Sequence, residues 1–255
     1  MTALRTAAII GLAAVALGLG GCAGGGMNGA RTSSQEAARL NTDLGLGYYQ
    51  QGRLDVALER LERAVRQDPR FAPAHSSLAL VYEALDQTSD AERHYRTALR
   101  LSERDAGLLN TYAVFLCRQG RHEEARDYFL RAVDDRLYRT PEVALTNAGV
   151  CMRDVPDLER AEGYFRQALQ HNPQFPEALL QMAGLSHERE NHMAARAFLE
   201  RFLNAGNATP EALMLGVRVE RALGDDEAAG DYAQRLRRDF PDSSEASEAR
   251  GGSGS

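Results

Sequence analysis

The chain has 255 residues, of which 44% are hydrophobic and 26% carry a charge, and its formal net charge is −6. This acidic balance argues against nucleic acid or anionic lipid headgroups as the main partner, because both repel a negatively charged surface. The length leaves room for one domain with a sizeable core or for an array of repeats.

The first residues have the pattern of a secretory signal peptide, with one positive charge at Arg5, an apolar stretch over 7–19 and then small residues. The alternative is a transmembrane helix, but the glycines from Gly18 onward end the run before the about 20 apolar residues that a span needs. The segment LGGC, which ends at Cys22, resembles the bacterial lipobox. That resemblance implies cleavage after residue 21 and acylation of Cys22, whereas a small-residue cleavage site followed by a chance cysteine is the other interpretation.

Several acyl chains anchor a protein stably where a single chain does not. In lipoproteins of this kind an aspartate after the cysteine retains the protein at the inner membrane, so Ala23 favours the outer membrane by resemblance. Residues 22–36 are rich in Gly and Ser and predict a flexible tether, and the small, polar residues 242–255 predict a disordered tail. Removing the signal removes Arg5 and leaves a net charge of −7.

A motif of small residues around an aromatic residue or leucine recurs along the rest of the chain. Its first alanine falls at successive intervals of 34, 34, 36, 34 and 34 residues, at Ala57, Ala91, Ala125, Ala161, Ala195 and Ala229. Self-similarity at this period predicts a solenoid of helix–turn–helix units. Over 37–241 we therefore expect an all-α chain of about six such repeats.

The first unit closely resembles the tetratricopeptide repeat, which implies a right-handed superhelix. The matching residues are Leu44, Gly45, Tyr48, Gly52, Ala57, Leu61, Ala64 and Pro69. Ala57 and Ala64 are seven residues apart, on one face of a helix, where small side chains let two helices approach closely. The fifth and sixth units depart from the pattern, because Phe202 replaces a small residue and Gly216-Val217 matches loosely. Two extra residues before Pro141 interrupt the period between units three and four.

No motif for catalysis or cofactor binding occurs in the sequence, and we expect neither an enzyme nor a cofactor. His187 and His192 are five residues apart, about 140° around a helix, so they are not expected to share a metal ion from one helix face.

The first helices of stacked repeats line a concave surface, which is the expected binding site for an apolar or amphipathic peptide segment. The usual groove positions of this repeat carry over to Leu46, Tyr49, Leu80, Asn110, Val114 and Val150, together with Thr42, Ser76, Arg118, Thr146 and Arg153. The alternative is that Leu46, Leu80, Val114 and Val150 only complete the packing between neighbouring first helices.

Cys117 and Cys151 occupy positions twelve and ten of the first helix in units three and four. The offset of two residues is about 3 Å along a helix, and packed helices lie about 8 to 10 Å apart, so the side chains can meet. An oxidising compartment and an even number of remaining cysteines predict a disulfide between them. Two buried free thiols are the alternative.

A lipobox, a tether and six repeats together resemble the PilF/PilW family of type IV pilus lipoproteins. The resemblance covers the chain from Cys22 to about Pro241, and its most specific stretches are NTDLGLGYYQQGRLDVALERLERAVRQDP and the pair NTYAVFLCRQGRHEEARDYF and TNAGVCMRD. It implies a monomeric outer-membrane lipoprotein that binds secretin subunits of the pilus and promotes their localisation and multimerisation. A periplasmic repeat scaffold for β-barrel assembly or peptidoglycan remodelling is the alternative, and an enzyme whose site escapes recognition is the weaker one.

Overall fold

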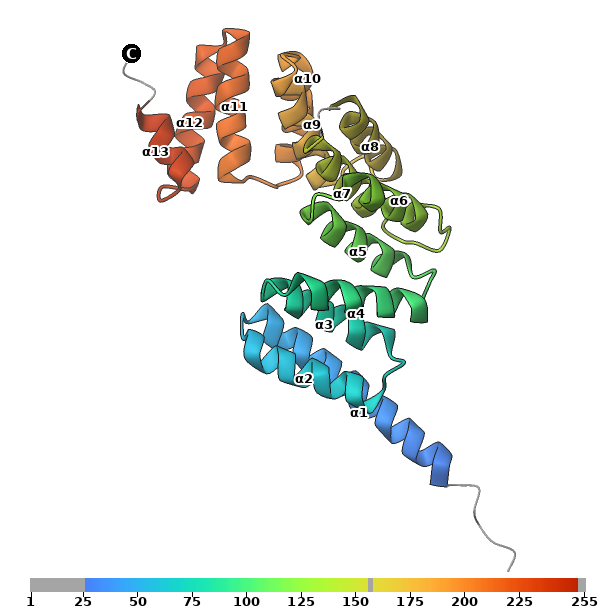
Figure 1. The fold of residues 1–255 in the computed structure, drawn as a ribbon. Coiled ribbons are helices and arrows are strands. Elements are labelled where there is room, and N and C mark those ends of the chain that lie inside the picture. The colour runs from blue at the N-terminus through green and yellow to red at the C-terminus, as the bar shows by residue number, and fades with distance from the viewer. Residues whose placement is uncertain (1–25, 156–157, 252–255) are drawn as a thin grey trace, which may run out of the picture.

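The computed structural model describes residues 26–155 and 158–251. Within these residues the chain forms thirteen α-helices and no strand, and the helices stack in pairs into a curved superhelical array (Figure 1). The helices are α1 (Gly26–Gln50), α2 (Leu54–Gln67), α3 (Ala72–Ala84), α4 (Thr88–Leu101), α5 (Ala106–Arg118), α6 (His122–Val133), α7 (Pro141–Arg153), α8 (Leu158–His171), α9 (Pro176–Glu188), α10 (His192–Asn204), α11 (Pro210–Leu223), α12 (Asp226–Asp239) and α13 (Ser244–Gly251).

Each odd-numbered helix from α1 to α11 pairs with the helix that follows it, which gives the six repeats that the 34-residue period predicts. Small residues allow the close approach within each pair. Ala57 and Ala64 have no exposed surface, and a Cβ added to Gly45 would lie 2.5 Å from Cγ of Leu61. The first of these alanines recurs as a buried residue in all six units, so the sequence itself specifies the repeated pairing of helices.

The turn inside a repeat needs one residue with a left-handed backbone. Gly52 (φ 72°) and Gly120 (φ 74°) fill this place in the first and third repeats at little steric cost. Asp86 (φ 57°) and Glu190 (φ 60°) fill it in the second and fifth, so the turn forms there in spite of a Cβ. The geometry of the repeat therefore overrides the local preference of these two residues.

The fifth and sixth repeats are as regular as the others, although their sequences depart from the pattern. Phe202 is buried between the fifth repeat and Ala212 of the next, and Val217 is fully buried. Gly216 serves the sixth repeat as Gly45 serves the first, because a Cβ there would lie 2.8 Å from the ring of Tyr232. The departure from the repeat pattern is therefore confined to the sequence, and the helix pairs themselves are regular.

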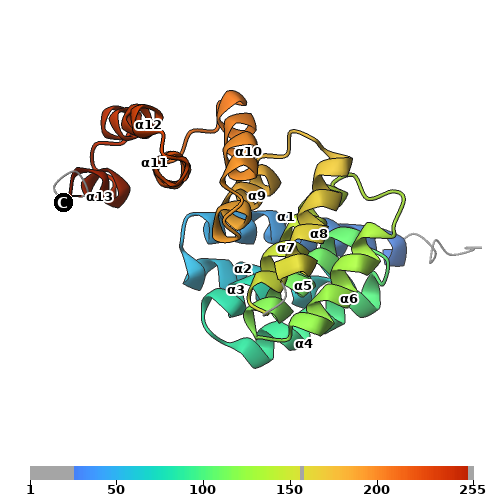
Figure 2. The same ribbon diagram turned by 90° about the horizontal axis from the view of Figure 1, so that it is seen from above.

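Both ends of the solenoid differ from the sequence-based expectation. Helix α1 already begins at Gly26, so the part of the expected tether from Gly26 onward is helical. The expected disordered tail contains α13, which packs on α11 and α12 with Ala246 and Ala249 buried. Arg218 of α11 also forms an ion pair with Glu248 at 2.9 Å. With these two alanines α13 covers the last apolar face of the stack. Figure 2 shows α13 beside α11 and α12.

None of the helices in the described part of the chain is long and apolar enough to cross a membrane. The expected signal peptide, Cys22 and Ala23 lie outside the described residues.

Candidate functional site

The first helices of the repeats form one surface, along which α1 contacts α3, α5 contacts α7, and α7 contacts α9. Five of the six expected groove residues are half-buried on this surface: Leu46, Tyr49, Leu80, Asn110 and Val114. Val150 is 43% exposed. Leu80 and Val114 also pack against the main core, so the groove positions contribute to packing and still present apolar surface to a ligand.

Tyr49 of α1 and Leu80 of α3 line one hollow of about 350 Å³. Its rim carries Glu83 and Arg118, which form an ion pair at 2.7 Å between α3 and α5. The apolar part of its lining is Tyr49, Leu80 and Ala84, and its other five lining residues are polar or charged, so a peptide residue in the hollow would meet both kinds of surface.

Polar pairs connect the first helices of the later repeats. Asn147 of α7 donates a hydrogen bond from Nδ2 to Oδ1 of Asn110 at 3.1 Å. Arg153 of α7 donates to Oε1 of Gln181 at 2.7 Å and also pairs with Glu188. These bonds hold the concave surface of repeats three to five in one arrangement, and they engage two residues, Asn110 and Arg153, that the sequence assigns to the groove.

Three other groove positions present less to a ligand than the sequence suggests. The hydroxyl of Thr42 donates to the carbonyl of Ala38 at 2.8 Å, and the hydroxyl of Thr146 donates to the carbonyl of Glu142 at 2.7 Å. Both threonines are buried. The hydroxyl of Ser76 is likewise bonded to its own helix. Hydroxyls satisfied within the helix add no recognition of their own.

The disulfide predicted from the repeat frame is present. Cys117 of α5 and Cys151 of α7 are bonded, with their Cα atoms 5.7 Å apart and a sequence separation of 34. The bridge joins repeats three and four across the junction that the two extra residues lengthen. Nδ1 of His122 lies 3.9 Å from Sγ of Cys117 and 3.6 Å from Sγ of Cys151. Although these three side chains have the composition of a metal site, the sulfur atoms are bonded to each other and offer no thiolate.

The expectation for His187 and His192 is wrong in its geometry. It places both residues on one helix, whereas α9 ends at Glu188 and α10 begins at His192. The turn between the helices brings the two Nδ1 atoms to 3.2 Å. His75 and His94 form a similar pair, with their Nδ1 atoms 3.0 Å apart. Burial, together with His75 and Arg93, lowers the pKa of His94 to about 4, so His94 is neutral near pH 7.

One apolar pair on α1 is exposed, although its second residue, Leu44, matches the repeat pattern. Leu40 is 60% exposed and Leu44 is 42% exposed, one turn apart on α1. In an inner repeat a preceding helix pair would cover this face, but α1 belongs to the first repeat. The position of this repeat at the start of the array could have indicated the exposure, because no preceding repeat among the described residues covers a core leucine there.

Profiles of the tetratricopeptide repeat match residues 45–86, 77–139, 157–218 and 211–243. Together with the stacked helix pairs, they place the chain in the class of tetratricopeptide-repeat solenoids.

The chain is 34% identical over 237 residues to the type IV pilus assembly protein PilF of Pseudomonas aeruginosa, covering 92% of this chain and 94% of that protein. A solved structure from a functional characterisation of P. aeruginosa PilF superposes with a TM-score of 0.73 at 32% identity, over 86% of this chain and 99% of the other. The structure of PilW, described as a widely conserved type IV pilus biogenesis factor, gives a TM-score of 0.74 at 29% identity, over 83% and 97% of the two chains. The chain belongs to the PilF/PilW family of type IV pilus biogenesis proteins.

Proposed function

We propose that this protein is an outer-membrane lipoprotein that binds secretin subunits of the type IV pilus and promotes their localisation and multimerisation. The observation that carries the proposal is the match to a pilus assembly protein over nearly the whole length of both chains. Cys22 would hold the acyl chains, and the monomeric solenoid would carry the secretin. The protein would act by binding, without catalysis or a cofactor.

The proposed binding surface is the first-helix surface around the hollow of Tyr49 and Leu80. A peptide segment of the secretin would place an apolar side chain in this hollow, and Leu46, Val114 and Val150 would extend the apolar contact along the solenoid. Replacement of Leu46 or Leu80 by glutamate would put an unpaired charge against that segment and weaken binding.

The test measures secretin multimers in outer-membrane fractions from cells that carry a deletion of the gene. We expect the multimers to be lost in the deletion strain, restored by the wild-type chain and restored poorly by Leu46→Glu and Leu80→Glu. Leu137→Glu is the matched control, because Leu137 is 86% exposed in the loop before α7 and does not line the hollow of Tyr49 and Leu80.

Circular dichroism distinguishes a lost site from a lost fold. If both groove variants keep their helices and restore the multimers fully, the secretin does not bind at this hollow, and the exposed pair Leu40 and Leu44 becomes the next surface to test. If the deletion itself leaves the multimers unchanged, the proposed function is wrong.

A further inference from the structure

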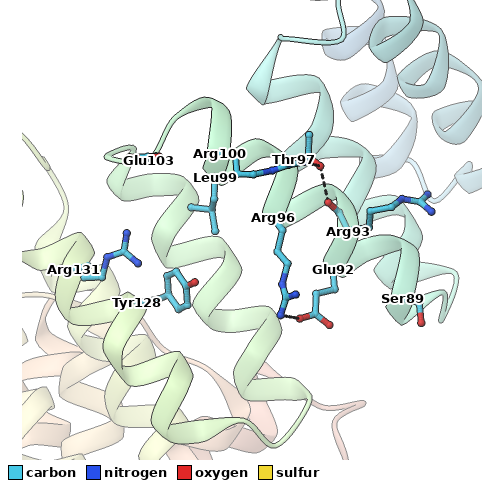
Figure 3. Close-up of a pocket in the computed structure, with 10 residues that line it drawn as sticks. All are labelled: Ser89, Glu92, Arg93, Arg96, Thr97, Leu99, Arg100, Glu103, Tyr128 and Arg131. Carbon is cyan, nitrogen blue, oxygen red and sulfur yellow. Dashed lines mark hydrogen bonds and ion pairs between the residues drawn. The ribbon is translucent and has the colours of Figure 1, made fainter.

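A second hollow is lined by residues of the second helices of two neighbouring repeats. It is a cleft of about 770 Å³ between the second helices α4 and α6 (Figure 3). We call it the arginine cleft, because four of its ten lining residues are arginines: Arg93, Arg96 and Arg100 on α4, and Arg131 on α6.

The cleft lies at the junction of the second and third repeats, where large side chains hold the backbones of α4 and α5 apart. Contacts between α4 and α5 are sparser than those between the corresponding helices at the other junctions, and Figure 1 shows α4 and α5 well separated. Large aromatic rings fill this junction. Tyr95 packs on Tyr112 and Phe115, and Tyr112 makes an edge contact with Tyr128 at 4.9 Å between ring centroids. These rings separate the helices and leave the outer side open between α4 and α6.

Two of the four arginines have no carboxylate partner among the described residues. Arg93 pairs with Asp90 at 2.6 Å, and Arg96 pairs with Glu92 at 2.7 Å. Arg100 donates a hydrogen bond only to the hydroxyl of Thr97 at 3.0 Å, and Arg131 stacks over the ring of Tyr128 at 4.9 Å.

The carboxylates in the lining do not cancel this charge. Glu92 is already held by Arg96 and, at 2.7 Å, by Arg121, and both arginines lower the pKa of its carboxyl group. Glu103 lies in the loop after α4 and forms no ion pair in the described part of the chain. Arg100 and Arg131 together therefore leave an excess positive charge beside Glu103, on a chain whose net charge is −6.

We propose that the arginine cleft binds an extended acidic polypeptide segment from a partner protein. Guanidinium groups bind carboxylates through paired hydrogen bonds, and the ring of Tyr128 and the side chain of Leu99 offer apolar surface between the charges. The spacing favours a polypeptide over a single phosphate group. Arg93 and Arg100 are seven residues apart, about 10 Å along a helix at 1.5 Å per residue. An extended chain covers that distance in about three residues at 3.3 Å each.

The test is fluorescence anisotropy with the full chain and two synthetic heptapeptides. In the first, glutamate alternates with leucine, and in the second, glutamine replaces every glutamate. We expect the acidic peptide to bind and the glutamine peptide to bind at least about tenfold more weakly. Added salt should lower the affinity of the acidic peptide. The double variant Arg100→Gln/Arg131→Gln should bind the acidic peptide at least about tenfold more weakly than the wild type, since each arginine supplies a charge-assisted hydrogen bond.

The first repeat supplies a matched control. On α2, Arg66 lies 34 residues before Arg100, and Arg63 lies twice that number of residues before Arg131, so both occupy equivalent positions of the repeat. The variant Arg63→Gln/Arg66→Gln removes the same charge, and we expect it to bind the acidic peptide as the wild type does. Equal weakening by both double variants would mean that surface charge in general attracts the peptide, which would overturn the proposal.

Three further outcomes would overturn it: no binding of the acidic peptide, equal binding of both peptides, or full binding by Arg100→Gln/Arg131→Gln. Vesicles containing phosphatidylglycerol form a separate arm. If they bind in a manner that needs Arg100 and Arg131 while the acidic peptide does not bind, the cleft recognises lipid phosphates and the peptide proposal is wrong. None of these measurements uses the secretin, so they stand or fall independently of the proposed function.

Discussion

Removal of the disulfide tests the energetic link between repeats three and four. Cys117 and Cys151 are separated by 34 residues. In the chain-entropy treatment a bridge over a loop of this length stabilises the folded state by about 4 kcal/mol relative to the open chain. For a folded part of 150 to 250 residues, each kcal/mol corresponds to about 2 to 4 °C in Tm. We therefore expect Cys117→Ser to lower the Tm by roughly 8 to 16 °C.

The two single variants and the double variant form a thermodynamic cycle. Each single variant already breaks the bridge, so the double variant should lose little more free energy of unfolding than either single variant does. The assay is thermal unfolding by circular dichroism, with and without a thiol reductant, on the chain without its first 22 residues. A reductant should lower the Tm of the wild type and leave that of the double variant unchanged.

Two results would refute this reasoning. Titration of two free thiols in the unfolded, unreduced protein would show that the bridge does not form. If the double variant is destabilised by the sum of the two single effects, the two side chains stabilise the fold separately, as buried apolar groups, and not through a common bond.

Three more predictions concern the anchor, the helix contacts and the effect of pH. Cys22→Ala should leave a folded protein that no longer sediments with the outer membrane in a density gradient; unchanged sedimentation would contradict the lipid anchor, unless binding to the secretin alone retains the protein. Gly149→Ala should destabilise the protein by about 1 to 3 kcal/mol in urea unfolding, because a Cβ would lie under 3 Å from the ring of Phe165. Gly184→Ala, in open space on α9, should instead stabilise it by about 0.5 to 1 kcal/mol. Because the pKa of His94 is lowered to about 4 in the folded state, the unfolded chain binds more protons between pH 6.5 and 4. Stability should therefore fall as the pH falls through that window, and His94→Asn should reduce the slope; an unchanged slope would exclude His94 as its source.

The regular part of the fold could be predicted because its constraint is local and repeated. Ala57 and its counterparts mark each helix pair, and the same frame places Cys117 and Cys151 opposite each other. The contact between His187 and His192 could not be predicted in this way, because it depends on where α9 ends and on the left-handed Glu190 between the helices. Helix α13 escaped prediction because its eight residues carry little apolar pattern, and the neighbouring repeat provides most of its stability.

The candidate site was only partly predictable for a related reason. A repeat frame indicates which positions face the concave surface, and two of the residues it assigns there, Tyr49 and Leu80, line one hollow. The frame does not show that the hydroxyl of Thr42 is hydrogen-bonded within its own helix. The arginine cleft depends on the separation of two helix pairs, which is set by the packed rings of Tyr95, Tyr112 and Phe115 and has no signature in the spacing of the arginines.

The junction between the second and third repeats also affects the shape of the concave surface. In a linear array each repeat touches only its neighbours, so the curvature of the solenoid is set junction by junction. On one side of this junction lie Leu46, Tyr49 and Leu80, and on the other side lie Val114 and Val150, on repeats that the disulfide joins covalently. The buried rings of Tyr95, Tyr112 and Phe115 at this junction fix how far apart the two halves of the concave surface lie. The ion pairs Glu83–Arg118 and Glu92–Arg121 join the same two repeats.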